Sequence, residues 1–442
     1  MSPRLPSLSD ALKLPRIPGV PDVFHRVRVP SDLESVTTVG DEEEPESAGL
    51  DRELIEEIWD AAVDLYRSGV HPGLQLCLRR EGRTVINRAI GHARGNGPSD
   101  SEDTPKTPMT PETPACIFSA SKAVTALVVH KLDERGLLHI GDRVSEYIPE
   151  YAQKGKEGTT IAHVLAHRAG VASMPKEALD LDRVGDREFL TRMVSEAKPS
   201  IRPGRVLAYH AVSGGFILGE IVQRVTGKSI REVLAEEFLD PLGFRWGNYG
   251  VDPNDTNEVA PAYVTGPALL PPLSILVTRV LSQPLDRVVD VSNDPRFLTA
   301  VIPSANVVTT ADELSRFFEI FRQGGELDGV RVMEERTIRR ALTEQSHLEI
   351  DFSLVFPTRF SYGLMLGAKY VSLYGRDTDL AFGHLGLINI MGWADPERAL
   401  SGGLITTGKA IVYPELPRFY GLMQKIASEV PKLEAKPAWL LG

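Results

Sequence analysis

Residues 115–136 read ACIFSASKAVTALVVHKLDERG and form the most informative stretch of this 442-residue chain. Four apolar residues recur at helical spacing and a glycine follows as a C-terminal cap, namely Val124, Leu127, Val128, Leu132 and Gly136. This pattern predicts a buried helix from Ser119 to Arg135. Ser119 then lies at the helix N-terminus, which favours negative charge on its oxygen, and Lys122 lies one turn later on the same face. With this spacing the Lys122 amine can reach the Ser119 hydroxyl, which makes Ser119 a candidate nucleophile and Lys122 its candidate activating partner.

The tetrapeptide Ser-x-x-Lys is weak evidence by itself, because this chain contains it three times. The other two copies are residues 173–176 and 195–198. Pro175 interrupts the first of these, and Pro199 directly follows the second, so neither is expected to open a long helix. Helix context therefore selects Ser119 over the other two serines.

Two further motifs follow Ser119-Ala120-Ser121-Lys122 in order along the chain. They are Tyr209-His210-Ala211 and His384-Leu385-Gly386. Together the three segments resemble the signature of class C β-lactamases, penicillin-binding proteins and the esterases related to them. Residues 163–170, which read HVLAHRAG, are also similar to a segment of that family. The resemblance covers roughly residues 50–430.

The resemblance implies a role for each matching residue. Ser119 would attack an acyl carbonyl, and Lys122 and Tyr209 would share its proton and return one to the leaving group. Which of the two is the base stays open, because both side chains have ordinary pKa values near 10. The backbone amides of Ser119 and Leu387 would form the oxyanion hole, with Leu387 on an edge strand, and Gly386 would permit close approach of substrate.

The chain departs from the family pattern at two positions. Ala211 stands where β-lactamases have an asparagine that helps to hold the substrate amide. His384 stands where they have a lysine, which weakens a fixed positive charge for a β-lactam carboxylate. Both changes favour esters over β-lactams. His210 is a candidate substrate contact that donates in place of the missing asparagine.

The expected fold class is α+β, of the β-lactamase/DD-peptidase type, with an antiparallel sheet flanked by helices and built from both chain ends. A helix from Leu50 to about Gly69 and a hairpin precede the nucleophile, and strands and a final helix close the chain. The hairpin, later strands and final helix are expected over 74–78 with 84–86, around 361–367, 380–393 and 401–412, and over 415–429. A largely helical lobe, roughly residues 120–295, is inserted between these parts.

The domain is expected to cover residues 49–442. Residues 1–48 are rich in proline and acidic residues and are expected to form an extended or partly disordered extension. Within the helical lobe, residues 266–291 are apolar. They suggest either a lid or acyl-pocket wall, or an ordinary buried helix, and the second interpretation is favoured.

Composition excludes several function classes. The formal net charge of -11 argues against a nucleic-acid partner, because such binding depends on neutralising phosphates. The chain has two cysteines, too few for a disulfide framework, and shows no H-E-x-x-H or C-x-x-C motif, so neither metal nor cofactor is predicted. The N-terminus lacks the apolar core of a secretory signal, and no segment is long enough to span a membrane, so a cytoplasmic protein is expected.

The sequence thus predicts a serine hydrolase that cleaves small-molecule carboxylic esters with short to medium acyl chains through an acyl-enzyme on Ser119. Three alternatives share the fold and the acyl-enzyme chemistry: acyl transfer, β-lactam hydrolysis and cleavage of D-amino-acid peptides. A fourth is a non-catalytic module that binds a ligand or partner in the cleft. The oligomeric state cannot be predicted.

Overall fold

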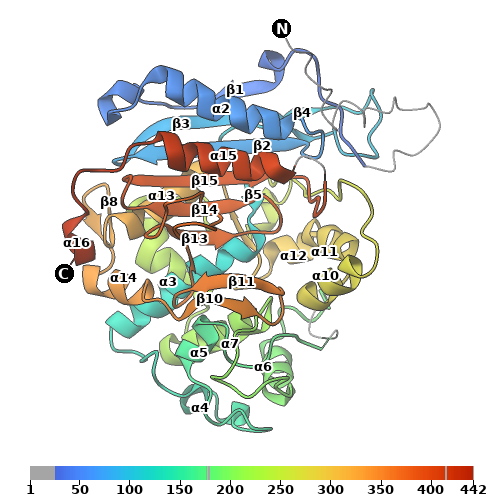
Figure 1. Cartoon of the computed structure of the whole chain (residues 1–442). Coiled ribbons are helices and arrows are strands. Elements are labelled where there is room, and N and C mark those ends of the chain that lie inside the picture. Colours follow the sequence, from blue (N-terminus) through green and yellow to red (C-terminus); the bar gives the residue numbers. More distant parts are fainter. Residues whose placement is uncertain (1–24, 176, 178–179, 414–415, 442) are drawn as a thin grey trace.

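The computed structural model describes residues 25–441, apart from 176, 178–179 and 414–415, and is built around one antiparallel sheet (Figure 1). The sheet has ten strands, and its main path runs β1-β3-β2-β15-β14-β13-β12-β11-β10, with β4 pairing β3. Their bounds are β1 Thr37–Val39, β2 Gly73–Arg80, β3 Arg83–Arg94, β4 Thr107–Pro108, β10 Ser346–Asp351, β11 Phe356–Phe360, β12 Met365–Leu366, β13 Phe382–Leu385, β14 Met391–Asp395 and β15 Leu400–Thr406. Strands from both chain ends meet where β2 pairs β15, which confirms the expected α+β architecture.

Helices cover both faces of this sheet, because alternate side chains along a strand point to opposite faces and each face packs on helices. Leu74, Leu76 and Leu78 of β2 join the core formed with α2 (Arg52–Tyr66) and α15 (Leu416–Glu429). The alternate residues of β2 face the other side, where the Gln75 side chain accepts from the backbone of α13 (Ala311–Arg322) and Cys77 contacts Asp312. The period of two along the strand therefore places one helical layer on each face.

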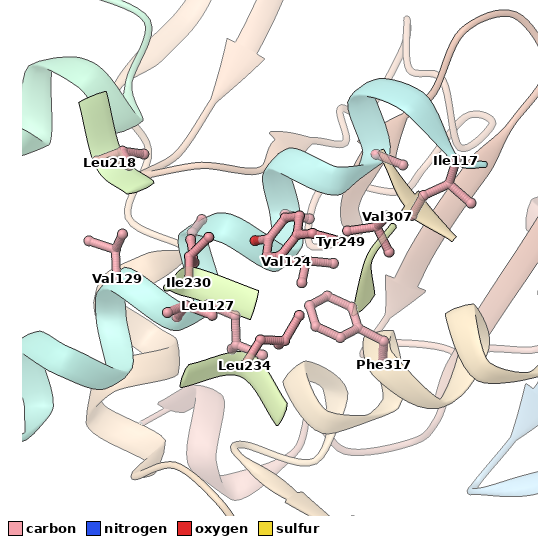
Figure 2. Packing of buried hydrophobic residues seen from close by; sticks show 14 of the residues in the cluster. Ile117, Val124, Leu127, Val129, Leu218, Ile230, Leu234, Tyr249, Val307 and Phe317 are labelled. Carbon is pink, nitrogen blue, oxygen red and sulfur yellow. The ribbon is translucent and has the colours of Figure 1, made fainter. Parts of the chain in front are cut away.

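The helical lobe is organised around α3 (Ser121–Glu134), which is buried on all sides. Twelve of its fourteen residues are buried. Figure 2 shows Val124, Leu127 and Val129 of α3 among side chains from other helices and from β7. The lobe's other elements are α4 Val144–Tyr147, α5 Ile161–Leu165, α6 Arg187–Glu196, α7 Ser213–Thr226, α8 Ile230–Leu234 with a π-helical turn Ala235–Leu239, and α9 Asp240–Leu242. A helix enclosed in this way fixes the positions of the residues at its N-terminus.

Smaller elements complete the chain between α9 and the later strands. A three-stranded sheet joins β5 (Ala115–Cys116), β7 (Val307–Thr309) and β6 (Asn248–Tyr249), and β8 (Glu326–Leu327) pairs β9 (Val330–Arg331). The remaining helices are α10 Leu273–Leu281, α11 Leu285–Ser292, α12 Pro295–Thr299, α14 Glu335–Ala341 and α16 Ala438–Leu441. No helix in the described part of the chain is long and apolar enough to cross a membrane.

Part of the expected N-terminal extension packs on the domain. Residues 1–24 lie outside the described residues, but β1 pairs with β3 and so adds a strand to the edge of the sheet. The acidic run 41–44 forms ion pairs, with Glu42 and Arg88 2.8 Å apart and Glu43 and Arg83 2.9 Å apart. Part of this segment therefore lies against the sheet, because strand pairing and charge pairing rather than apolar periodicity attach it.

The apolar segment 266–291 forms two helices and not one. No residue of α10 is buried, and Ile275 is 65% exposed. The favoured interpretation, an ordinary buried helix, is therefore wrong. Leu281 at the end of α10 and Val288 of α11 instead line a cleft that Ser119 also lines. The segment forms a wall of that cleft.

Gly403 of β15 tests how closely α13 packs on the sheet. A Cβ atom there would come within 2.3 Å of the Ala311 carbonyl oxygen at the start of α13. Gly403→Ala should therefore destabilise the fold by about 1–3 kcal/mol, as overpacking does. Gly421 of α15 is the matched control, because a Cβ atom there meets nothing within 4 Å. Gly421→Ala should raise the free energy of unfolding, measured with urea, by about 0.5–1 kcal/mol. Equal unfolding midpoints for the two variants would contradict the packing argument.

Candidate active site

Ser119 lies in a 3₁₀ turn, Phe118–Ala120, directly before α3. Phe118 has a φ of +48°, a conformation that a non-glycine residue adopts only when neighbours hold it. The Ser121 hydroxyl provides that support, because it donates to the Phe118 carbonyl and accepts from the Val307 amide of β7 at 3.0 Å. The turn therefore presents a half-buried Ser119 at the helix N-terminus, as the sequence predicts.

The Lys122 amine lies next to the Ser119 hydroxyl. Its Nζ is 3.2 Å from Ser119 Oγ and 3.0 Å from the Ser304 carbonyl oxygen. The Ser304 hydroxyl is itself held, since it accepts from the Gly215 amide and donates to the Val212 carbonyl. Burial lowers the pKa of Lys122 to about 7. A large fraction of the amine is therefore neutral at physiological pH and able to accept a proton.

Tyr209 approaches the same pair from the loop before α7. Its ring centroid is 5.0 Å from Lys122 Nζ. Burial raises the pKa of Tyr209, and a hydrogen bond with the Ser119 side chain opposes that shift. The three residues that the sequence predicts as nucleophile and proton-transfer groups therefore lie together.

An apolar cleft of about 340 Å³ opens in front of Ser119. Its lining includes residues of the turn before α3, of the loop before α7 and α7 itself, of α10, α11 and α12, and of the segments 180–184, 302–305 and after β13. Its lining residues include Ser119, Ala211, Phe216, Leu281, Val288 and Leu387. A cleft of this size and polarity suits an apolar group of several carbon atoms.

The His384-Leu385-Gly386 segment continues from β13 to the cleft. The expectation of an edge strand is wrong, because β13 pairs with β14 on one side and with β12 on the other. However, β12 is only two residues long and pairs with Phe382 and Gly383, so it ends before the segment reaches the cleft. A Cβ atom on Gly386 would come within 2.6 Å of the Ile117 carbonyl oxygen, so only glycine fits there.

The backbone amides proposed for the oxyanion hole are both available. In the described part of the chain, neither the Ser119 amide nor the Leu387 amide donates to a backbone or side-chain acceptor. Ile388 and Asn389, which follow Leu387, have φ values of +46° and +56°. This tight turn is held by Asn389, whose side chain contacts His71 and Tyr413.

The two predicted histidines lie away from the cleft surface. His384 is 1% exposed, and its Nδ1 is 2.8 Å from the Leu385 carbonyl oxygen. His210 is fully buried and lines a separate small cavity together with Lys122. Burial is the main cause that lowers the pKa of both imidazoles to about 3, so both are neutral. Neither histidine lines the cleft that Ser119 lines.

Comparison with known proteins decides the family. The model of the Beta-lactamase family matches residues 52–415. The chain belongs to the beta-lactamase family. The esterase/beta-lactamase LipL of Mycobacterium tuberculosis is 29% identical over 310 residues, which are 65% of this chain and 68% of LipL.

Two solved structures of beta-lactamase-like proteins share the fold. A penicillin-binding protein homologue from Caulobacter crescentus has a TM-score of 0.71 and 25% identity, and the match covers 86% of this chain and 98% of that one. A family VIII carboxylesterase has a TM-score of 0.72 and 24% identity, covering 87% and 98%. The resemblance seen in the sequence is confirmed, and the chain has the fold of beta-lactamase-family serine hydrolases with esterases among its relatives.

Three residues that sequence reasoning missed position Tyr209 in this beta-lactamase-family site. Asp351 accepts the Tyr209 backbone amide at 3.1 Å, and Glu349 accepts the Leu207 amide at 3.2 Å. The ring of His167 packs on that of Tyr209 with centroids 4.7 Å apart. Asp351 and Glu349 lie on β10, a strand that the sequence did not predict. His167 lies in the recognised segment 163–170, which was its only signal.

Possible metal ligands do not cluster. Among the described residues, no three His, Cys, Asp or Glu side chains form a group that could hold a metal ion. Both cysteines, Cys77 and Cys116, are buried free thiols.

The burial of Lys122 predicts a pH-dependent stability effect. Its pKa is about 7 in the fold against 10.5 ordinarily, so the unfolded chain binds one more proton between those values. Lys122→Met removes the free-energy cost of burying and deprotonating this amine on folding. At pH 7 and below, the free energy of unfolding of the variant should exceed that of the native chain by on the order of a few kcal/mol. The contribution of the hydrogen bonds that the variant loses reduces this gain. The gain should shrink as the pH rises towards 10, as measured by urea unfolding.

Ser119→Ala is the control for this measurement. It removes a hydrogen bond to the amine and leaves the amine in place, so its stability difference from the native chain should change little between pH 7 and 10. A stability difference for Lys122→Met that does not vary over that range would show that the buried amine stays protonated throughout.

Proposed function

We propose that the protein is a metal-free serine esterase that cleaves carboxylic esters with short to medium acyl chains through an acyl-enzyme on Ser119. The observation that carries this proposal is the 3.2 Å contact between Lys122 Nζ and Ser119 Oγ. A neutral amine at that distance is the general base that a serine hydroxyl needs, since its own pKa is far above neutrality.

In the proposed acylation step, Ser119 Oγ attacks the ester carbonyl while its proton passes to Lys122. Tyr209 is less suited to be the base, because burial raises its pKa and keeps the phenol protonated. Its hydroxyl instead relays the proton from Lys122 to the departing alkoxide, which leaves as the alcohol. The carbonyl oxygen carries the negative charge of the tetrahedral intermediate, and the Ser119 and Leu387 amides would donate to it.

Deacylation uses the same groups in the same order. A water molecule attacks the acyl carbon, its proton passes to the Lys122 and Tyr209 pair, and Ser119 Oγ leaves with that proton. The products are a carboxylic acid and the free serine. Because one proton is taken up and returned in each half of the cycle, no metal or redox group is required.

The cleft supports esters as substrates rather than β-lactams. Ala211 lines it and offers only a methyl group where an amide donor would hold a lactam side chain. His384 is buried and its lowered pKa, about 3, leaves no positive charge to meet a lactam carboxylate. An ester needs neither contact, because it presents no amide nitrogen and no obligatory carboxylate.

The first test is hydrolysis of 4-nitrophenyl butyrate together with labelling by a fluorophosphonate. The native protein should release nitrophenol and be labelled on Ser119. Ser119→Ala should abolish labelling and lower kcat by at least about 10³-fold, and Tyr209→Phe should lower kcat by about 10²-fold. On the acid side of its pH profile, kcat/KM should decrease with an apparent pKa near 7, because Lys122 must be neutral to act. This decrease is the acid limb of the profile.

The same experiment separates the proposal from its alternatives. Folded native protein that is not labelled at Ser119 would refute the proposed function and favour a binding module. Turnover of nitrocefin faster than that of the butyrate ester would contradict the argument from Ala211 and His384.

Acyl-chain selectivity should depend on α11. Val288 lines the cleft, so Val288→Trp fills part of the space for the acyl chain. We expect kcat/KM for the octanoate ester to fall about tenfold or more, while that for the acetate ester changes less than about twofold. Ile275→Trp on α10 is the matched control, because Ile275 is 65% exposed and does not line the cleft. Loss of activity on both esters to the same degree would place the acyl chain elsewhere.

A further inference from the structure

The imidazole of His210 is a buried polar group that the proposed mechanism does not use. The residue is 0% exposed, and neither ring nitrogen has a hydrogen-bond partner among the described residues. A neutral imidazole carries one donor and one acceptor. An unpaired donor or acceptor in the interior destabilises the fold, so the chain tolerates two such atoms only if something in their surroundings satisfies them.

A small cavity beside His210 has the size and the lining to do so. Its volume is about 20 Å³, and His210, Lys122, His167 and Ser304 are among its lining residues. About 10–15 Å³ of this kind of space is enough for one water molecule, provided that two to four polar groups are present to bind it. This cavity provides them and has no room for a larger ligand.

The hydrogen-bonding groups of Lys122 explain why the amine needs a further partner in this cavity. As a neutral amine it has two N–H donors and one lone pair. To act as the base, the amine must direct its lone pair at the Ser119 hydroxyl, which leaves two N–H groups to be placed. The Ser304 carbonyl at 3.0 Å accepts one of them. The remaining contact in the described structure is the face of the Tyr209 ring, 5.0 Å away, which is a weak acceptor for a neutral N–H.

We propose that one internal water molecule in this cavity bridges Lys122 to His210, and that His210 is a positioning residue that directs the Lys122 lone pair at Ser119. The inference deepens the proposed esterase function and rests on it. The water accepts the second N–H of Lys122 and donates to a ring nitrogen of His210. With two acceptors in fixed places, the amine has one orientation left for its lone pair.

The charges around the cavity keep His210 neutral, as this arrangement requires. Burial and the nearby Lys122 amine lower the pKa of His210 to about 3. His167, stacked on His210 with ring centroids 5.6 Å apart, has its pKa lowered well below its ordinary value by burial and by His210. The other titratable groups of the site are Tyr209, His384 and Asp351, and Asp351 accepts the Tyr209 amide. His210 therefore serves as a neutral acceptor throughout the working pH range.

The kinetic test compares two variants of His210. His210→Phe keeps a ring of similar size and removes both nitrogens, whereas His210→Gln keeps polar atoms within reach of the water. For His210→Phe we expect kcat on 4-nitrophenyl butyrate to fall about tenfold with KM changed less than about twofold. The acid limb of kcat/KM should move down by about half a pH unit or more, because the charged amine loses more from the missing hydrogen bond than the neutral amine does. His210→Gln should recover at least half of the lost kcat.

His130→Phe is the matched control for the loss of a buried histidine. His130 lies on α3, is 0% exposed, and contacts the Tyr362 carbonyl rather than the site. It should lower stability without moving the acid limb. An acid limb that stays in place in His210→Phe, or that moves equally in His130→Phe, would overturn the proposal.

A crystal structure of the native protein provides a test that does not depend on activity. The expected result is one ordered water within hydrogen-bond distance of both Lys122 Nζ and a ring nitrogen of His210. A cavity without water density, or a direct contact between the two side chains, would overturn the proposal even if His210→Phe does not fold. If Ser119 is not labelled by the fluorophosphonate, the esterase function fails, whereas the water bridge is still decided by this structure.

Discussion

The structure depends most on one energetically unfavourable feature, the burial of the Lys122 amine beside Ser119. An ammonium group removed from water is strongly destabilised unless it loses its proton or finds a carboxylate. No carboxylate in the described part of the chain pairs with Lys122, and its contacts are the Ser119 hydroxyl, the Ser304 carbonyl and the Tyr209 ring. The fold must therefore supply enough burial elsewhere to hold the amine in place. The enclosure of α3 between the sheet and the helical lobe does this, because its apolar side chains are buried on every side.

The same requirement explains why the site is assembled from distant parts of the chain. Ser119 and Lys122 are fixed by one helix, but shielding the amine from bulk solvent needs walls on several sides. The loop of Tyr209 forms one wall and is held by Asp351, which lies 142 residues further along the chain. The Ser304 segment, held by hydrogen bonds to the start of α7, forms another. The site thus lies between the sheet lobe and the helical lobe, and residues of both enclose it.

The features of the sequence that are local could be predicted, and those that depend on long-range pairing could not. The helix behind Ser119 was predicted because its periodicity lies within one segment, and Tyr209 and His384 were found because their motifs resemble a known family. Asp351 was missed because a single acidic residue on an exposed hairpin has no local signal, and β10 itself has a mostly exposed, irregular pattern. The attachment of residues 25–48 was missed for a similar reason, since ion pairs such as Glu42 with Arg88 leave no periodic pattern.

Burial also shifts the pKa values of Lys122 and Tyr209 in opposite directions, which bears on the proposed proton transfer. Removal from water disfavours every charged form, so it lowers the pKa of the amine and raises that of the phenol. The two shifts have opposite signs but one cause, and they leave a neutral amine beside a neutral phenol above pH 7. The alternative resting state, an ammonium beside a phenolate, would bury two charges in the same space. In the proposed mechanism, desolvation therefore favours Lys122 as the base and Tyr209 as the proton relay.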